Sequence, residues 1–182
     1  MEQYIDALTG EKLTEKPEHM TQLYGNRLIS KAHPRIEFRG KLDALIAKSL
    51  EVQLTAREQG QAPAAADLQE ITDRLWQIMA AEVKEECLPE QLLLGMDEDT
   101  LRRISQNVRG AFGMEHPTPD CTMGRLCVEI NSLRAQARET EIAAVRAVPE
   151  RLDILRAMNR LSSAVYVIFC RQLSGWYETK SK

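Results

Sequence analysis

Two arginines and a glutamate share one helical column in the stretch NSLRAQARETE, residues 131–141. Arg134, Arg138 and Glu141 stand at positions i, i+4 and i+7. On a helix this spacing places the three side chains within roughly 60° of arc, one turn above the next. One interpretation is a solvated face on which opposite charges pair, which stabilises a helix by only tenths of a kcal/mol. The other is a pair of guanidinium groups that bind phosphate, because arginine presents a planar fork of donors.

Asn159 is a second candidate for chemistry. It falls within the apolar stripe predicted for the last long helix, whose other members are Leu152, Leu155, Ser162, Tyr166 and Phe169. An amide buried in such a stripe costs a few kcal/mol unless it finds hydrogen-bond partners. We therefore expect Asn159 either to bond a neighbouring helix in the core or to bind a polar ligand between helices.

A third group of candidates lies in TQLYGNRLISKAHPRIEFRGKLDAL, residues 21–45. Lys31 and Arg35 belong to a polar segment around the start of the first predicted helix, and Asp43 follows inside that helix. Taken alone, Asp43 is expected to be a surface carboxylate.

Composition limits the partners that these residues could have. The chain has 182 residues, a formal charge of -3 and a pI of about 5.7, which does not suit binding to a polyanionic nucleic acid. No apolar run approaches the length of a membrane span, and MEQYIDALTG lacks the pattern of a secretory signal. We expect a cytoplasmic protein whose four scattered cysteines are reduced thiols.

Apolar periodicity predicts an all-α bundle of five helices to position the candidates. The predicted helices run from Pro34 to about Gly60, over 64–87, over 96–108, from about Met123 to Val148, and from Pro149 to about Leu173. The core stripe of the first is Phe38, Leu42, Leu45, Ile46, Ser49 and Val52, and that of the second is Leu68, Ile71, Leu75, Ile78 and Met79. Residues 1–33 are expected to be an irregular segment, 34–173 the bundle domain, and 174–182 a frayed tail.

Several other kinds of site do not match the sequence. A ferritin-like di-iron bundle needs Glu-x-x-His pairs on helices, whereas His19, His33 and His116 fall in predicted loops. The chain contains no GxxxxGK[ST] or GxGxxG motif, and no Ser or Cys stands in a nucleophile elbow. His116, Cys121 and Cys127 match no common metal-ligand spacing, so we expect no metal ligands among the side chains.

Three separated motifs, in this order, resemble the bundle-type ATP:cob(I)alamin adenosyltransferases. The first comprises Thr21, Leu23, Gly25, Arg27, Lys31, Pro34, Arg35, Glu37, Gly40, Asp43 and Leu45. The second is the family's arginine helix, R-x-x-x-R-x-x-E, which is carried here by Arg134, Arg138 and Glu141. The third is the family's L-N-R-L-S-D, which reads MNRLSS here, residues 158–163. The stretches KPEHMTQL, SKAHPRIEFRGKLD, RETE and LSSAVYV are similar to the ethanolamine-utilisation branch of corrinoid adenosyltransferases.

The resemblance implies a reaction and roles for the candidates. The reaction moves the 5′-deoxyadenosyl group of ATP onto cob(I)alamin, which gives adenosylcobalamin and triphosphate. Arg134 would pair with Asp43 of a neighbouring subunit, and Arg138 would hold ATP phosphates while Glu141 fixes its direction. Thr21, Lys31 and Asn159 would also bind ATP, with Mg²⁺ held mainly by phosphate oxygens.

The resemblance also implies partners. A homotrimer would carry each active site between two subunits. A flavoprotein would serve as the reductant, and an adenosylcobalamin-dependent enzyme would use the product. A bacterial microcompartment is an alternative location to the open cytoplasm. An apolar wedge is expected to exclude the lower ligand of cobalt, and Phe112, in the loop before the fourth helix, is our candidate. The other interpretation of Phe112 is a loop anchor.

Departures from the family pattern leave a second function open. The ethanolamine branch has a His and Cys-Cys-x-x-Cys cluster, but YIDALTG aligns there without cysteine, so that metal dependence is not carried over. DALTGEKLTEKPEHM replaces the Gly- and Thr-rich phosphate loop of the other branch. Glu139 stands where the family has a further arginine, and Ser163 where it has aspartate. The alternative is a non-catalytic helical module for cobalamin delivery or protein interaction.

Overall fold

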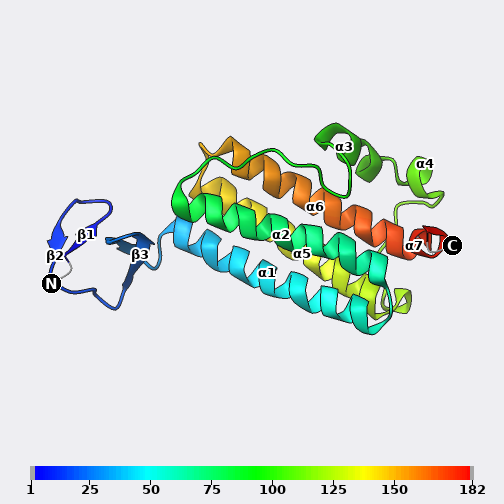
Figure 1. The fold of residues 1–182 in the computed structure, drawn as a ribbon, viewed down its shortest axis with the longest axis horizontal. Coiled ribbons are helices and arrows are strands. Elements are labelled where there is room, and N and C mark those ends of the chain that lie inside the picture. The colour runs from blue at the N-terminus through cyan, green and yellow to red at the C-terminus, as the bar shows by residue number, and fades with distance from the viewer. Residues whose placement is uncertain (1–2, 181–182) are drawn as a thin grey trace.

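The computed structural model describes residues 3–180, which form a bundle of four long helices with a small sheet at one end (Figure 1). The long helices are α1 (Pro34–Glu58), α2 (Ala62–Lys84), α5 (Arg125–Ala147) and α6 (Leu152–Leu173). The connection from α2 to α5 carries α3 (Glu98–Gln106), α4 (Val108–Phe112) and the 3₁₀ turn η1 (Cys121–Met123), and α7 (Trp176–Lys180) follows α6. Helix α5 packs against α1 and α6, and α2 packs against the same two helices.

Local sequence explains where the helices begin. Pro34 lies in the first turn of α1, and the His33 imidazole accepts a hydrogen bond from the backbone N–H of Arg35 at 3.2 Å. The Asp97 carboxylate caps α3 by accepting from the Thr100 N–H at 2.8 Å. The third predicted helix, 96–108, is divided at Asn107 into α3 and α4.

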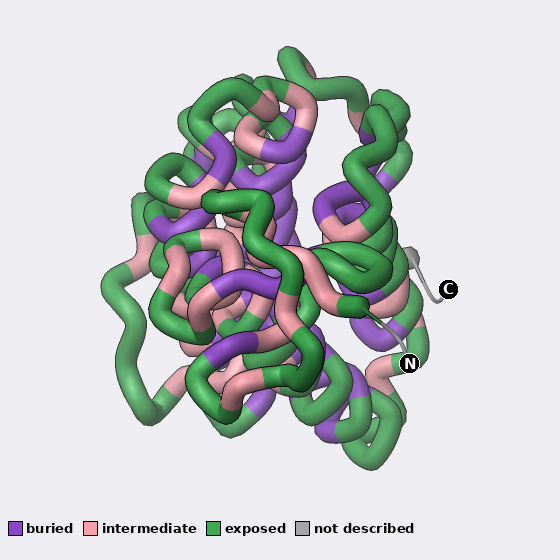
Figure 2. Tube along the Cα trace, turned by 90° about the vertical axis from the view of Figure 1, so that its left-hand side faces the viewer, coloured by how far each residue is buried: buried purple, intermediate pink, exposed green. Residues whose placement is uncertain are grey.

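The predicted core stripes of α1 and α2 are confirmed. All six stripe residues of α1 are buried, and four of the five in α2 are buried, while Met79 packs at the edge of the core. In Figure 2 the buried segments lie mostly toward the interior and exposed loops form the periphery. Burial of these apolar faces, rather than intrinsic helix propensity, therefore holds the bundle together.

The prediction of an irregular N-terminal segment, and hence of an all-α fold, is wrong in part. Four strands, β1 (Tyr4–Asp6), β2 (Lys12–Leu13), β3 (Met20–Tyr24) and β4 (Arg27–Ser30), form a sheet in the order β2-β1-β4-β3. Strands β3 and β4 are an antiparallel hairpin around Gly25, which has a φ of 56°. A Gly-Asn pair between short apolar runs is a hairpin signal, which we overlooked because each strand is so short.

A buried carboxylate joins this sheet to the bundle. Glu82 of α2 is fully buried and pairs with Arg35, at 2.6 Å, and with Arg39, both on α1. Arg39 also donates from Nη1 to the Leu23 carbonyl of β3 at 2.8 Å. Glu82 thus fixes the start of α1 and, through Arg39, the hairpin that bears Thr21.

The frayed tail expected after residue 173 is also contradicted, over the described residues. Tyr177 of α7 is buried, and its hydroxyl donates to Asp67 of α2 at 2.6 Å. Arg171 of α6 pairs with the same carboxylate at 2.7 Å and lies over the ring of Trp176. These contacts dock α7 on the bundle, although it is only one turn long.

Candidate active site on the face of α5 and α6

A hollow of about 460 Å³ opens where α5 and α6 meet the connection before α5. We call it the α5–α6 hollow, and its lining residues are Ser105, Gln106, His116, Pro117, Pro119, Asn131, Arg134, Arg138, Ser162, Ser163 and Tyr166. The structure therefore brings both arginines of the predicted column to one concave site. It also places there Ser163, which stands where the family motif has aspartate.

The packing of α5 explains why the arginines face outward. Ile130, Leu133 and Ala137 are buried against the core. The neighbouring face carries Arg134, which is half-buried, and Arg138, which is exposed. Glu141, on the same column, is half-buried.

The two guanidinium groups have no acidic partner within the part of the chain that the structure describes. Arg134 donates from Nε to the Asn131 side-chain oxygen at 3.1 Å, and its guanidinium carbon lies 5.8 Å from the centre of the Tyr166 ring. Among the described residues, no carboxylate forms an ion pair with Arg134 or Arg138. Glu139 pairs instead with Lys41 of α1. The interpretation in which Arg134 and Arg138 pair with acidic residues on their own helix is therefore wrong. Both guanidinium groups stay available to an anion.

His116 and Tyr166 form a contact that the sequence analysis did not single out. The Tyr166 hydroxyl lies 3.0 Å from His116 Nδ1, and the two rings are nearly parallel, with centres 6.3 Å apart. Burial raises the pKa of Tyr166 to about 12, so its hydroxyl stays protonated at neutral pH. The pair holds the loop after α4 against α6, on the edge of the hollow. Tyr166 stands seven residues after Asn159 and was predicted on the same helical face, but helical spacing cannot predict its contact with His116.

Asn159 does not lie in the apolar stripe where it was expected. The buried stripe of α6 is Ile154, Met158, Leu161, Val165 and Ile168. Asn159 is exposed, and its side-chain oxygen accepts a hydrogen bond from Arg160 Nη2 at 2.9 Å. Since α5 and α6 are antiparallel neighbours, Asn159 and Glu141 stand at similar heights, each about two turns from the connecting turn.

The N-terminal candidates lie outside the α5–α6 hollow of the same chain. Thr21 is half-buried on β3, Lys31 is exposed just after β4, and Asp43 is exposed on α1. Within residues 3–180, no ion pair joins Asp43 to Arg134. The sheet that carries Thr21 lies beside the end of the bundle where α1 and α6 begin (Figure 1).

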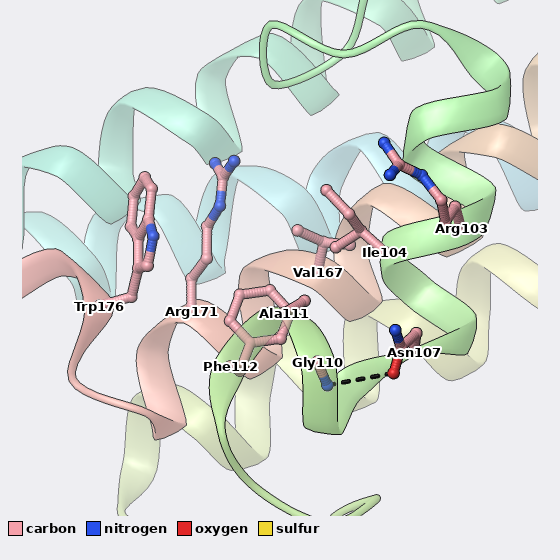
Figure 3. Close-up of a pocket in the computed structure, with 9 residues that line it drawn as sticks. All are labelled: Arg103, Ile104, Asn107, Gly110, Ala111, Phe112, Val167, Arg171 and Trp176. Atoms are coloured by element: carbon pink, nitrogen blue, oxygen red, sulfur yellow. Dashed lines mark hydrogen bonds between the residues drawn. The ribbon is translucent and has the colours of Figure 1, made fainter.

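Phe112 lines a separate hollow of about 360 Å³ between α3, α4, α6 and α7. Figure 3 shows its ring there among Ile104, Val167 and Arg171, with Trp176 at the far side. The dashed bond in that view joins the Gly110 N–H to the Asn107 side-chain oxygen at 3.1 Å. Phe112 is half-buried against the core, as a loop anchor would be, and it does not line the α5–α6 hollow.

Clusters of metal ligands and membrane-spanning helices are both missing from the described residues. In the part of the chain that the structure describes, no group of three or more His, Cys, Asp or Glu side chains is placed to hold a metal ion. Of the three side chains considered as ligands above, Cys127 is buried and burial raises its pKa, whereas His116 bonds Tyr166. None of the helices between residues 3 and 180 is long and apolar enough to cross a membrane.

Comparison with known proteins agrees with the motifs. Residues 12–172 match the family model described as cobalamin adenosyltransferase. The chain is 35% identical over 167 residues to the corrinoid adenosyltransferases EutT of Salmonella typhimurium strain LT2 and of Escherichia coli strain K12. The matched region covers 88% of this chain and 61% of each relative, so the chain spans about three fifths of their length. No solved structure matches the chain. The family model covers most of the sequence and includes all three motifs, so the chain belongs to the cobalamin adenosyltransferase family.

Proposed function

We propose that this protein transfers the 5′-deoxyadenosyl group of ATP to the cobalt of cob(I)alamin. The observation that carries the proposal is the pair Arg134 and Arg138, which face one hollow and form no ion pair with a carboxylate among residues 3–180. The planar fork of Arg138 suits the oxygens of a triphosphate, while Arg134 would be left for a carboxylate of a neighbouring subunit. Family membership and the EutT relatives support the same reaction.

The chemistry needs positioning and charge stabilisation rather than a general base. The Co(I) centre attacks the ribose 5′-carbon, a cobalt–carbon bond forms, and the bond from that carbon to the triphosphate oxygen breaks. The leaving triphosphate takes the electron pair. Arg138 would stabilise the growing negative charge, Lys31 would add a second positive charge, and Glu141 would orient Arg138. Asn159 and Thr21 would bind the nucleotide.

Mg²⁺ fits this site only as an ion that arrives with the nucleotide. The described side chains offer no cluster of acidic ligands, and Mg²⁺ commonly takes substrate phosphates with few protein ligands. When bound, the ion would neutralise part of the triphosphate charge. The protein groups left for the remaining charge are Arg138 and Lys31.

We propose that the complete site forms between subunits of a homotrimer. The N-terminal candidates and the arginine pair do not meet within one chain, so a neighbour would have to supply Asp43 to Arg134. Exposed apolar side chains on α1 and α5 support association of this kind, namely Leu50, Leu54, Ile142 and Val145. The reductant, the consuming enzyme and the cellular location stay predictions.

The proposal is tested by anaerobic turnover with ATP, Mg²⁺ and chemically reduced cob(I)alamin, followed by the adenosylcobalamin spectrum. Arg138→Ala is expected to lower kcat/KM about 10²–10³-fold, since one charge-stabilising donor contributes about that much. Arg146→Ala is the matched control, because Arg146 is exposed on the same helix but does not line the hollow. Equal turnover by the two variants would contradict the role of Arg138. A protein that tolerates Arg138→Ala and Asn159→Ala together would fit the non-catalytic module instead.

A further inference from the structure

A third hollow, of about 530 Å³, lies along the first half of α6 and shares no lining residue with the proposed active site. It is enclosed by residues 87–97, by the start of α3 and by α6, and we call it the connection hollow. In Figure 1 this connection leaves the end of α2 and runs alongside α6 toward α3. None of its lining residues has a role in the proposed transfer reaction.

Arg74 of α2 lines the connection hollow and is only 5% exposed. Its guanidinium donates to three neutral acceptors: the Gln77 side chain at 2.8 Å, the Pro89 carbonyl at 2.9 Å and the Gln91 side chain at 3.5 Å. Over residues 3–180, no carboxylate forms an ion pair with it. Burial lowers the pKa of Arg74, and no nearby acid opposes the shift. A buried cation without a counter-charge is costly, which makes this residue unusual.

Arg171 shows the ordinary arrangement in the same protein. It is 9% exposed, and its guanidinium pairs with Asp67 at 2.7 Å. The contrast indicates that Arg74 lacks the partner that burial of an arginine usually requires. An anion bound in the connection hollow would supply that partner.

The acidic residues of the hollow already have other partners. Asp153 pairs with Arg151 at 2.8 Å, Glu98 lies 3.2 Å from Arg160, Glu90 lies 3.9 Å from Arg156, and Asp97 caps α3. Among the described residues that line the hollow, Arg74 is therefore the buried cation whose charge no carboxylate neutralises. The Arg160 Nε atom is also buried, with an ion-pair contact to Glu98 but no well-directed hydrogen bond.

The remaining walls of the hollow are apolar and fixed in place. Leu88, Leu93, Leu101 and Ala157 are buried. The loop is held by a hydrogen bond from the Leu94 N–H to the Glu70 carboxylate at 2.8 Å. A volume of this size suits a small molecule, and an apolar lining with a few convergent polar groups is typical of ligand sites.

We propose that the connection hollow binds a small amphipathic anion, whose carboxylate or phosphate head pairs with Arg74 and whose apolar body packs on the leucines. The head group would accept from the guanidinium fork, which suits both kinds of oxyanion. This site is independent of the proposed transferase reaction.

The test uses octanoate and octyl phosphate as probes, with 1-octanol and octylammonium as neutral and cationic controls of the same chain length. Calorimetric titration of the whole protein is expected to show each anion binding at least about tenfold more tightly than octanol, because a charged hydrogen bond adds that much. The tighter of the two anions identifies the preferred head group. Arg74→Gln is expected to abolish the preference for anions, and Arg57→Gln, an exposed arginine on α1 outside the hollow, is expected to keep it.

A second measurement needs no variant and stands even if Arg74→Gln does not fold. Octanoate added to the wild-type protein is expected to shift the NMR signals of Leu88, Leu93, Leu101 and Ala157 together. Shifts at these positions support the site. Absence of binding by every probe, equal binding of octanoate and octanol, shifts confined to other regions, or an unchanged anion preference in Arg74→Gln would each overturn it.

Discussion

Replacement of Glu82 by glutamine is expected to destabilise the whole fold, because this carboxylate neutralises two arginines at once. Glu82 is fully buried, while the side chains of Arg35 and Arg39 are 17% and 14% exposed. Removing one partner of a buried ion pair costs about 3–5 kcal/mol, and the residual exposure of the arginines favours the lower end, about 3 kcal/mol. In a chain of this size, that loss lowers the Tm by about 6–12 °C.

The matched control is Glu85→Gln. Glu85 pairs with the same Arg35 at 2.8 Å, but its side chain is 54% exposed, so its loss should cost at most about 1 kcal/mol. Both variants would be followed by thermal unfolding and by urea titration of the circular dichroism signal. If Glu82→Gln were no less stable than Glu85→Gln, the buried network would not support the fold as we argue. Because Arg39 also holds β3, we further expect Glu82→Gln to weaken ATP binding if Thr21 contacts the nucleotide.

Three further predictions concern the start of α6, the C-terminal helix and the last residue of α4. Arg151 holds the pKa of Asp153 well below its usual range. This stabilisation is complete above the unfolded pKa and is lost as pH falls through the folded one. The destabilisation caused by Asp153→Asn, measured by urea titration, should therefore be clear at pH 7 and shrink below about pH 4, and a pH-independent difference would contradict the ion pair. Tyr177→Phe removes the hydrogen bond to Asp67 and should cost about 1.5–3 kcal/mol of unfolding free energy, whereas an unchanged Tm would show that α7 is not docked through this contact. If Phe112 is the wedge that excludes the lower ligand of cobalt, Phe112→Ala should lose the four-coordinate Co(II) spectrum seen with ATP, and a spectrum that persists would leave Phe112 as a loop anchor.

The helical part of the fold could be predicted because its apolar periodicity is strong. The stripe from Phe38 to Val52 repeats over several turns, and burial is the only common property of its members. The sheet could not be predicted in the same way, since its strands are only two to five residues long and too short for a sustained alternation of apolar and polar residues. Docking of Tyr177 depends on Asp67, which is 110 residues away in the sequence, so no local sequence pattern could predict this contact.

The candidate site was predictable in its arginine pair but not in its surroundings. Helix α6 is apolar on more than one face, so the period alone allowed two stripes, and the one containing Leu152 and Asn159 was the wrong choice. Leu152 is 61% exposed, whereas Ile154 is fully buried. His116 was not predicted as a residue of this site, because its place there depends on a tertiary contact with Tyr166 that no helical spacing indicates.

The central claim is that the protein forms a cobalt–carbon bond with the adenosyl group of ATP. The most direct measurement is an anaerobic reaction of the wild-type protein with ATP, Mg²⁺ and cob(I)alamin, in which adenosylcobalamin and triphosphate are quantified together. We predict that the two products appear in equal amounts. ATP cleavage to ADP without adenosylcobalamin, or no product from protein that binds both substrates, would contradict the proposed reaction.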